Sequence, residues 1–172
     1  MIITKSPFRI SFIGGGSDLP SFFCDHEGAV LSTSIDKYIY VSSHRFFSED
    51  KIRLKYSKTE TVTHLDTIEH PIFKEVLKQF NIQGAVEISS NADIPSGSGL
   101  GSSSSFTANV LLNCYIRANQ YVTKEKLAQN ACDIELNKLK EPIGKQDHYA
   151  AVFGGLNVIV FKPSGDVEVQ PL

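Results

Sequence analysis

Hydrophobic and polar residues alternate with period two along several stretches of the chain, which is typical of half-buried β-strands. Near the N-terminus Phe8, Ile10 and Phe12 alternate in this way, and Gly14-Gly15-Gly16 then breaks the pattern. Turn residues such as Pro163-Ser164-Gly165-Asp166 separate the later stretches. The pattern predicts a strand or hairpin over residues 2–12 and strands over 28–34, 37–43, 52–56, 84–90, 156–161 and 167–169.

Apolar residues three and four positions apart predict helices in the middle of the chain. Residues 68–80 show this spacing, and so do residues 102–119 and 123–139, the last with Thr123 as its expected N-cap. Residues 145–152 are expected to form a shorter helix. Because strands and helices mix without strict alternation, the predicted class is α+β rather than a doubly wound parallel sheet.

A short helix is also expected over residues 19–24, directly after the glycine run. Asp18 is placed to cap the N-terminus of this helix, and Pro20 is tolerated in a first turn.

Length and composition narrow the class of protein. The chain has 172 residues, 41% hydrophobic and 21% charged, as expected for one globular domain. The net charge of −2 argues against a dedicated binder of nucleic acid or anionic membranes. No apolar run is long enough to span a membrane, so a cytoplasmic protein is expected. The sequence stops directly after a predicted strand, which suggests a domain cut from a longer protein.

The three cysteines, Cys24, Cys114 and Cys132, have no C-x-x-C spacing. A disulfide framework or a structural zinc site is therefore not expected, and a reducing compartment fits better.

The most informative stretch is the loop over residues 94–105, which a predicted strand enters and a predicted helix leaves. Gly97, Gly99 and Gly101 allow backbone conformations that other residues avoid and let a ligand approach the main chain closely. The helix that follows offers unpaired N–H groups and the positive end of its dipole, and phosphate is the usual occupant of such a site. The glycine spacing is neither that of a Walker A loop nor that of a dinucleotide fingerprint. The alternative is a flexible glycine- and serine-rich turn that only caps a helix.

Two motifs resemble those of the GHMP kinase superfamily. The run from Pro95 to Ser103 resembles its phosphate-binding motif, and the run from Pro7 to Asp18 is similar to its N-terminal substrate motif. Galactokinases have Glu-His where this chain has Gly15-Gly16. The Gly-Gly-Gly-Ser-Asp version resembles the D-glycero-D-manno-heptose 7-phosphate kinase branch.

The resemblance implies an α+β fold related to the second domain of ribosomal protein S5, with a mixed sheet packed against helices. It also implies that residues 1–172 form the N-terminal, ATP- and substrate-binding domain. Members of the family carry a second, C-terminal domain, which is absent from this chain. A face that normally packs on that domain could drive homo-oligomerisation.

The resemblance assigns catalytic roles to two residues. Asp147 matches the carboxylate that takes the proton of the attacking hydroxyl, although a lone aspartate is otherwise more often solvated or a helix cap. Arg9 matches a basic residue that can stabilise the moving phosphoryl charge, and its alternative is a surface arginine on a strand. His148, next to Asp147, is more often structural than a base.

The resemblance also implies binding roles. Glu135 and Ser103 match the Mg²⁺ ligands, with Asp133 as a rival expected on a different helix face. For the substrate phosphate, Lys37, Arg45, Lys140 and Lys145 are equal candidates. The expected nucleotide-binding residues are Pro95, Gly97, Ser98, Gly99, Leu100, Gly101, Ser102 and Ser103. The expected substrate-binding residues are Gly14, Gly15, Gly16, Ser17 and Asp18.

The function that this resemblance implies is an ATP- and Mg²⁺-dependent kinase acting on the anomeric hydroxyl of D-glycero-D-manno-heptose 7-phosphate. Its first alternative is another sugar 1-kinase with a galactose- or fucose-like substrate. A non-catalytic sugar- or nucleotide-binding module is a second alternative. A nucleic-acid-binding domain is a weaker third, against which the net charge argues.

Overall fold

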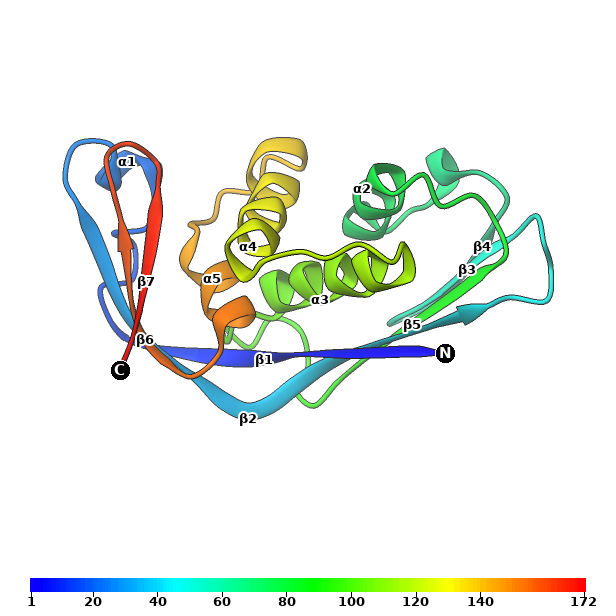
Figure 1. Cartoon of the computed structure of the whole chain (residues 1–172), viewed down its shortest axis with the longest axis horizontal. Helices are drawn as coiled ribbons and strands as arrows, with labels where there is room; N and C mark the ends of the chain where they lie inside the picture. Colours follow the sequence, from blue (N-terminus) through cyan, green and yellow to red (C-terminus); the bar gives the residue numbers. More distant parts are fainter.

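A computed structural model describes all 172 residues as a curved sheet with helices on one face (Figure 1). The sheet has seven strands. They are β1 (Ile2–Ile13), β2 (Gly28–Arg45), β3 (Ile52–Lys55), β4 (Thr59–Val62), β5 (Val86–Ala92), β6 (Leu156–Phe161) and β7 (Val167–Pro171). The strand order is β4-β3-β5-β2-β6-β7, and β1 pairs with β2. All pairs are antiparallel except β3 with β5, so the sheet is mixed and the α+β prediction is confirmed.

The longest strand, β2, joins the two ends of the sheet. Two strands with a break at Ile35-Asp36 were expected, but β2 runs unbroken for 18 residues and bends on the way (Figure 1). Its first part pairs with β6 and its second part with β5, while β1 follows it on the other side with two shifts of register. The bend therefore replaces the predicted break. Residues 35–37 have no paired residue and lie at a shift of register, but β1 pairs with Ser34 before them and with Tyr38 after them, so the strand continues.

The helices lie on one face of the sheet (Figure 1). They are α1 (Pro20–Phe23), the 3₁₀ turn η1 (Leu65–Thr67), α2 (Pro71–Gln79), α3 (Ser102–Arg117), α4 (Lys124–Cys132), the π-helix η2 (Asp133–Lys138) and α5 (Gln146–Phe153). The main core lies between α2, α3 and the sheet, where Phe8, Val41, Phe73, Val76 and Leu111 are fully buried. No helix is both long and apolar enough to cross a membrane.

The helix predictions differ from the structure in three places. The helix predicted over residues 123–139 is α-helical only to Cys132 and continues as a π-helix. Thr123 caps it as expected by accepting a hydrogen bond from the Lys126 N–H at 3.2 Å. The helix predicted from residue 68 begins at Pro71, which suits a first helical position. The cap of α1 is Leu19, with no side-chain hydrogen bond, so the prediction that Asp18 caps this helix is wrong.

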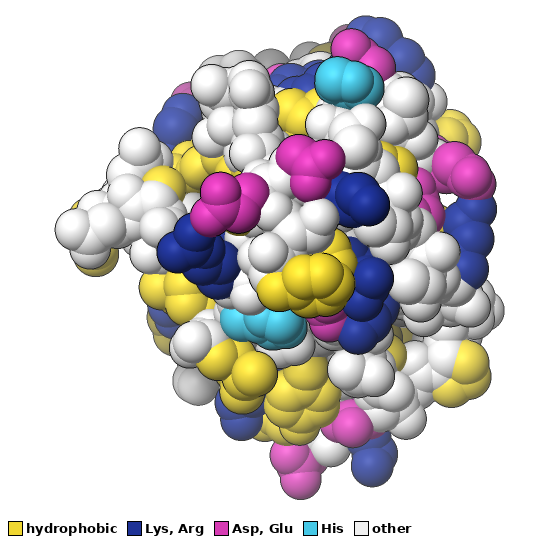
Figure 2. Space-filling model, turned by 90° about the vertical axis from the view of Figure 1, so that its right-hand side faces the viewer, with side chains coloured by type: hydrophobic (Ala, Val, Ile, Leu, Met, Phe, Trp, Pro, Cys, Tyr) yellow, Lys and Arg dark blue, Asp and Glu magenta, His cyan; other side chains and the backbone are white.

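At the end of the molecule that carries β3, β4 and the N-terminus, charged side chains of both signs are interspersed with apolar ones (Figure 2). Several of them form ion pairs, among them Arg45 with Glu49 at 2.8 Å and Lys78 with Asp66 at 2.7 Å. This mixture agrees with the nearly balanced charge of the sequence.

Candidate active site

The glycine-rich loop connects β5 to α3, as the sequence predicts. Gly97, Gly99 and Gly101 all adopt left-handed backbone conformations, with φ of 80°, 74° and 76°. Gly101 is the N-cap of α3, and no side chain caps this end of the helix. The loop is exposed from Pro95 to Gly99. Its geometry therefore leaves the N-terminal N–H groups of α3 open to an anion.

Arg9 joins this loop to Asp147. Its Nε and Nη2 donate to the two carboxylate oxygens of Asp147, each at 2.7 Å, and Nη1 donates to the carbonyl oxygen of Gly99 at 2.9 Å. The Arg9 backbone N–H also donates to the Leu100 carbonyl at 3.2 Å. Side chains 138 residues apart in the sequence thus meet in a two-pronged ion pair beneath the loop.

The fit between the pair and the loop is tight at Gly101. A methyl group there would lie 3.3 Å from Cγ of Arg9 and 3.4 Å from Oδ2 of Asp147. Asp147 stays partly accessible, with 24% of its side chain exposed, and each of its oxygens keeps a lone pair after bonding to Arg9. It can therefore still accept a hydrogen bond from a ligand hydroxyl.

The second expected loop, Gly14 to Asp18, follows β1 and lies against β2 and α5. The Ser17 hydroxyl donates to the Gly14 carbonyl at 2.7 Å and accepts from the Ala29 N–H at 3.1 Å. At Gly14, a Cβ atom would lie 1.9 Å from the Ala29 carbonyl oxygen, so only glycine fits. Gly15 and Gly16 are exposed, whereas Asp18 is buried.

The two expected metal ligands also come together. The Ser103 hydroxyl, in the first turn of α3, donates to Oε2 of Glu135 at 2.8 Å. The other carboxylate oxygen of Glu135 contacts Nε2 of the buried His148 at 3.2 Å. Asp133, the alternative candidate for a metal ligand, is half-exposed and accepts a hydrogen bond from Asn137 at 2.9 Å, so it takes no part in this cluster. The π-helix presents Glu135 rather than Asp133 to α3, and π-turns often mark functional sites.

The contact with His148 sets the charge of this cluster. Burial alone would raise the pKa of the Glu135 carboxyl, but the hydrogen bond and charge of His148, with help from Ser103, hold that pKa below its ordinary value. Burial alone would lower the pKa of His148, but the Cys132 and Glu135 side chains raise it to about 10. The directions of these two shifts favour an ionised Glu135 carboxylate beside a protonated His148, and His148 is a buried supporting residue.

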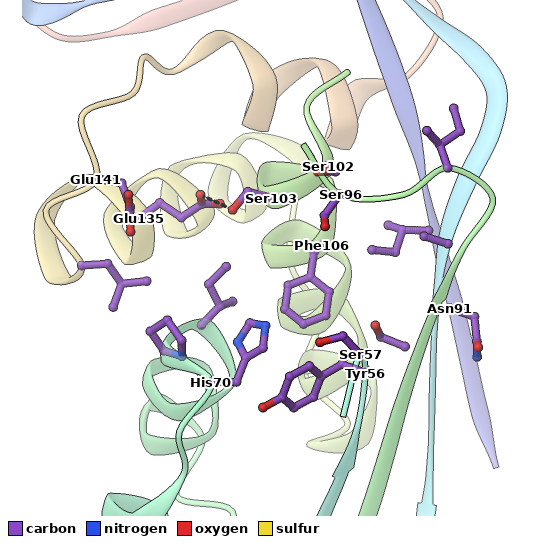
Figure 3. Close-up of a pocket in the computed structure, with 17 residues that line it drawn as sticks. Tyr56, Ser57, His70, Asn91, Ser96, Ser102, Ser103, Phe106, Glu135 and Glu141 are labelled. Carbon is purple, nitrogen blue, oxygen red and sulfur yellow. Dashed lines mark hydrogen bonds between the residues drawn. The ribbon is translucent and has the colours of Figure 1, made fainter. Parts of the chain in front are cut away.

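A cavity of about 600 Å³ opens beside the N-terminus of α3. Figure 3 shows Ser96, Ser102 and Ser103 at one end of it and Tyr56, His70 and Phe106 at the other. The aromatic rings pack closely, with ring centroids 4.7 Å apart for Tyr56 and His70 and 5.1 Å apart for His70 and Phe106. Sequence patterns did not single out Tyr56 or His70, because each lies outside the recognisable motifs.

A buried carboxylate supports the aromatic end of this cavity. Glu60 accepts from the Tyr56 hydroxyl at 2.5 Å and from the backbone N–H groups of Glu69 and His70 at 2.7 and 3.2 Å. Burial alone would raise the pKa of Glu60, but these three hydrogen bonds hold it below its ordinary value of 4.5.

Glu60→Gln is therefore expected to lower the free energy of unfolding by about 1–3 kcal/mol near neutral pH. The pKa of Glu60 is lower in the folded state than its ordinary value. The difference in free energy of unfolding between the variant and wild type is therefore fully present above about pH 4.5, and it disappears as the pH falls through the folded-state pKa. Urea unfolding at several pH values measures it. The exposed Glu27→Gln is the matched control, and an equal loss at all pH values would contradict the expectation.

The four candidate cations for a substrate phosphate are placed very differently. Lys145 immediately precedes α5, donates to the Gly165 carbonyl at 2.7 Å and lies over the Phe23 ring at 4.6 Å. Arg45 is 75% exposed and pairs with Glu49 at the far end of β2. Lys37 and Lys140 are exposed. Lys145 is the one that lies next in sequence to the Gln146-Asp147 segment.

The family profile described as "GHMP kinases N terminal domain" matches residues 67–155, which is more than half of the chain. The chain belongs to the GHMP kinase family. The matched range includes the glycine-rich loop, Glu135 and Asp147.

Two curated relatives are similar to most of this chain. The chain is 30% identical to a D-glycero-alpha-D-manno-heptose 7-phosphate kinase of Campylobacter jejuni, over 99% of this chain and 54% of that protein. It is 26% identical to a galactokinase of Pyrococcus furiosus, over 93% of this chain and 46% of that protein. The chain therefore spans about half the length of the curated relatives it matches.

Among solved structures, a D-glycero-D-manno-heptose 1-phosphate kinase from Bacteroides thetaiotaomicron superimposes with a TM-score of 0.91 at 26% identity. The match covers 100% of this chain and 60% of that one. A mevalonate kinase superimposes with a TM-score of 0.75 at 17% identity, over 98% of this chain and 55% of that one, which shows the shared fold.

Proposed function

We propose that residues 1–172 form the N-terminal domain of a sugar kinase that transfers the γ-phosphoryl group of ATP to a sugar hydroxyl. The observation that carries this proposal is the Arg9 guanidinium, which binds the carboxylate of Asp147 and the carbonyl of Gly99 at once. It joins a proton acceptor to a phosphate-binding loop, and phosphoryl transfer requires those two groups side by side.

In this proposal the phosphates of ATP lie on the loop from Pro95 to Ser103 and on the first turn of α3. The exposed glycines let the phosphates approach the backbone, and the helix dipole favours their charge. The adenine base occupies the aromatic end of the cavity, where Tyr56, His70 and Phe106 supply apolar walls.

Ser103 and Glu135 would hold Mg²⁺. Their oxygens lie 2.8 Å apart, so one cation could contact both. The ionised carboxylate and the hydroxyl are both hard oxygen donors, which Mg²⁺ prefers. When bound, Mg²⁺ neutralises phosphate charge.

Ser103→Ala is accordingly expected to raise the Mg²⁺ concentration that gives half-maximal activity by about tenfold or more. The change leaves the Glu135 carboxylate and its contact with His148 in place. Activity titrated with Mg²⁺ at saturating ATP measures the shift, and the exposed Ser164→Ala serves as the matched control. An unchanged Mg²⁺ requirement would remove Ser103 from the metal site.

Asp147 and Arg9 would carry out the transfer itself. The sugar hydroxyl oxygen forms a bond to the γ-phosphorus, its proton passes to an oxygen of Asp147, and the bond from the γ-phosphorus to the bridging oxygen of ADP breaks. Arg9 holds the Asp147 carboxylate in place and supplies positive charge beside the moving phosphoryl group.

The proposed acceptor is the anomeric hydroxyl of D-glycero-D-manno-heptose 7-phosphate. The Gly15-Gly16 pair, in place of the Glu-His of galactokinases, supports this choice, as does the similarity to relatives named for heptose phosphates. Lys145 is the proposed partner of the 7-phosphate. A galactose- or fucose-like acceptor is the second candidate, favoured by the similarity to a galactokinase.

Release of ADP by the full-length protein, with ATP, Mg²⁺ and a panel of sugars, tests the proposal. Turnover on heptose 7-phosphate but not on simple hexoses supports the first acceptor. Turnover on galactose or fucose instead would establish the second. Binding of ATP with no turnover on any sugar would favour a non-catalytic binding module and overturn the kinase.

A further inference from the structure

We infer that Asp18 is a positioning residue, which caps the N-terminus of α5 and so fixes Asp147, and that it does not bind the sugar directly. The inference rests on the proposed kinase function, and it departs from the sugar-binding role that the motif implies for Asp18. It also gives Asp18 a partner other than α1, the helix that the sequence led us to expect.

The carboxylate of Asp18 is buried and is hydrogen-bonded to other groups of the protein. The residue is only 2% exposed. One carboxylate oxygen, Oδ1, accepts from the Gly16 N–H at 3.1 Å and from Nε2 of Gln146 at 3.4 Å. The other, Oδ2, accepts from the Gln146 backbone N–H at 3.0 Å. A buried carboxylate whose two oxygens already accept three hydrogen bonds offers little to a sugar hydroxyl.

The partner of Asp18 is the first turn of the helix that carries Asp147. Gln146 is the first residue of α5, and its N–H belongs to the group that has no partner within a helix. Lys145, the N-cap, supplies no side-chain hydrogen bond to the N-terminus of α5. Asp18 therefore does from a distance what a capping side chain normally does locally, and its charge also suits the helix dipole.

Close packing makes this connection specific. A Cβ atom on Gly144 would lie only 1.8 Å from Oδ2 of Asp18, so the carboxylate rests directly on the backbone that leads into α5. Asp147 follows Gln146 by one residue, and it must also meet Arg9 at 2.7 Å. A shift at the start of α5 would move the proposed base relative to the phosphate loop.

The same contacts connect the Gly14–Asp18 loop, which is expected to bind the sugar, with the segment that carries the proposed base, Asp147. Asp18 holds the Gly16 N–H, and the Gln146 amide lies beside Gly15 and accepts from the Ser11 hydroxyl at 2.8 Å. The glycine loop and the start of α5 thus form one unit. The exposed part of this unit is the backbone at Gly15 and Gly16, whereas Asp18 is buried.

The test is steady-state kinetics of full-length Asp18→Asn with ATP and the preferred sugar. An amide places an NH₂ group against a backbone N–H, which loosens the cap. We expect kcat to fall by up to about 10²-fold, because the base is misplaced, while the KM for the sugar stays unchanged. The exposed Asp25→Asn is the matched control. A higher sugar KM with an unchanged kcat would show direct sugar binding and overturn the inference.

Gly144→Ala provides a second variant that alters no sugar-facing group. Its methyl group must displace the Asp18 carboxylate, so the same loss of kcat at unchanged sugar KM is expected. Wild-type kcat in this variant would overturn the inference.

A readout independent of turnover separates this inference from the proposed function. Amide hydrogen exchange in the first turn of α5 is expected to quicken in Asp18→Asn and Gly144→Ala, even if no sugar is phosphorylated. Unchanged exchange in both variants would show that Asp18 does not hold α5. Absence of turnover in the wild-type protein would instead overturn the kinase proposal and leave the exchange result valid.

Discussion

Asp147→Asn is expected to reduce kcat for phosphoryl transfer by about 10²–10⁴-fold, the usual contribution of a positioned general base. The amide nearly preserves the shape of the side chain but cannot take the hydroxyl proton. Arg9 keeps its bond from Nη1 to the Gly99 carbonyl, so the phosphate loop and the KM for ATP should change little. ADP release by the full-length protein measures both constants.

The matched control for this change is Asp25→Asn, which alters an exposed aspartate just after α1. It should retain wild-type kcat. Full activity of Asp147→Asn would show that the proton goes elsewhere and would remove Asp147 from the mechanism. A large rise in the KM for ATP without loss of kcat would assign Asp147 to the support of the loop.

His148→Ala is expected to lower the free energy of unfolding by about 3–5 kcal/mol, the usual cost of breaking a buried ion pair on one side. The change leaves Glu135, which is 1% exposed, as a buried carboxylate without its cationic partner. Ser103 remains as a hydrogen-bond donor but cannot offset the charge. Urea denaturation of His148→Ala and of the wild-type protein measures the loss.

A double variant shows whether the buried charge causes this loss. Adding Glu135→Gln to His148→Ala removes the uncompensated carboxylate and should recover part of the stability. The exposed His64→Ala should have a negligible effect. If the double variant were less stable than His148→Ala by the full cost of Glu135→Gln alone, the two groups would be independent and the ion pair would be ruled out.

Much of the fold could be predicted from local patterns. The glycine-rich loop lies between a strand and a helix as expected, because glycine spacing and apolar periodicity are local signals. The continuity of β2 could not be predicted, since Ile35-Asp36 reads as a break and the strand is held only by the pairs on either side of it, at Ser34 and Tyr38. The π-helix around Glu135 likewise has no local signal, because α- and π-turns use the same residue types.

The candidate site, like the fold, could be predicted from the sequence only in part. The motifs identified Arg9, Asp147, Ser103 and Glu135, and the structure brings them together as two contacting pairs. The roles of Asp18 and Glu60 could not be predicted, because their partners lie on other elements and depend on the topology. Asp18 reads as a cap for the next helix in sequence, yet it caps α5, which begins 128 residues later.

Phosphorus NMR of a reaction containing the full-length protein, ATP, Mg²⁺ and heptose 7-phosphate tests the central claim most directly. The proposed function predicts that a new sugar phosphate signal grows as the signal of the γ-phosphate declines, with ADP formed in equal amount. Formation of inorganic phosphate alone, or ATP that stays intact while it is bound, would contradict phosphoryl transfer to the sugar.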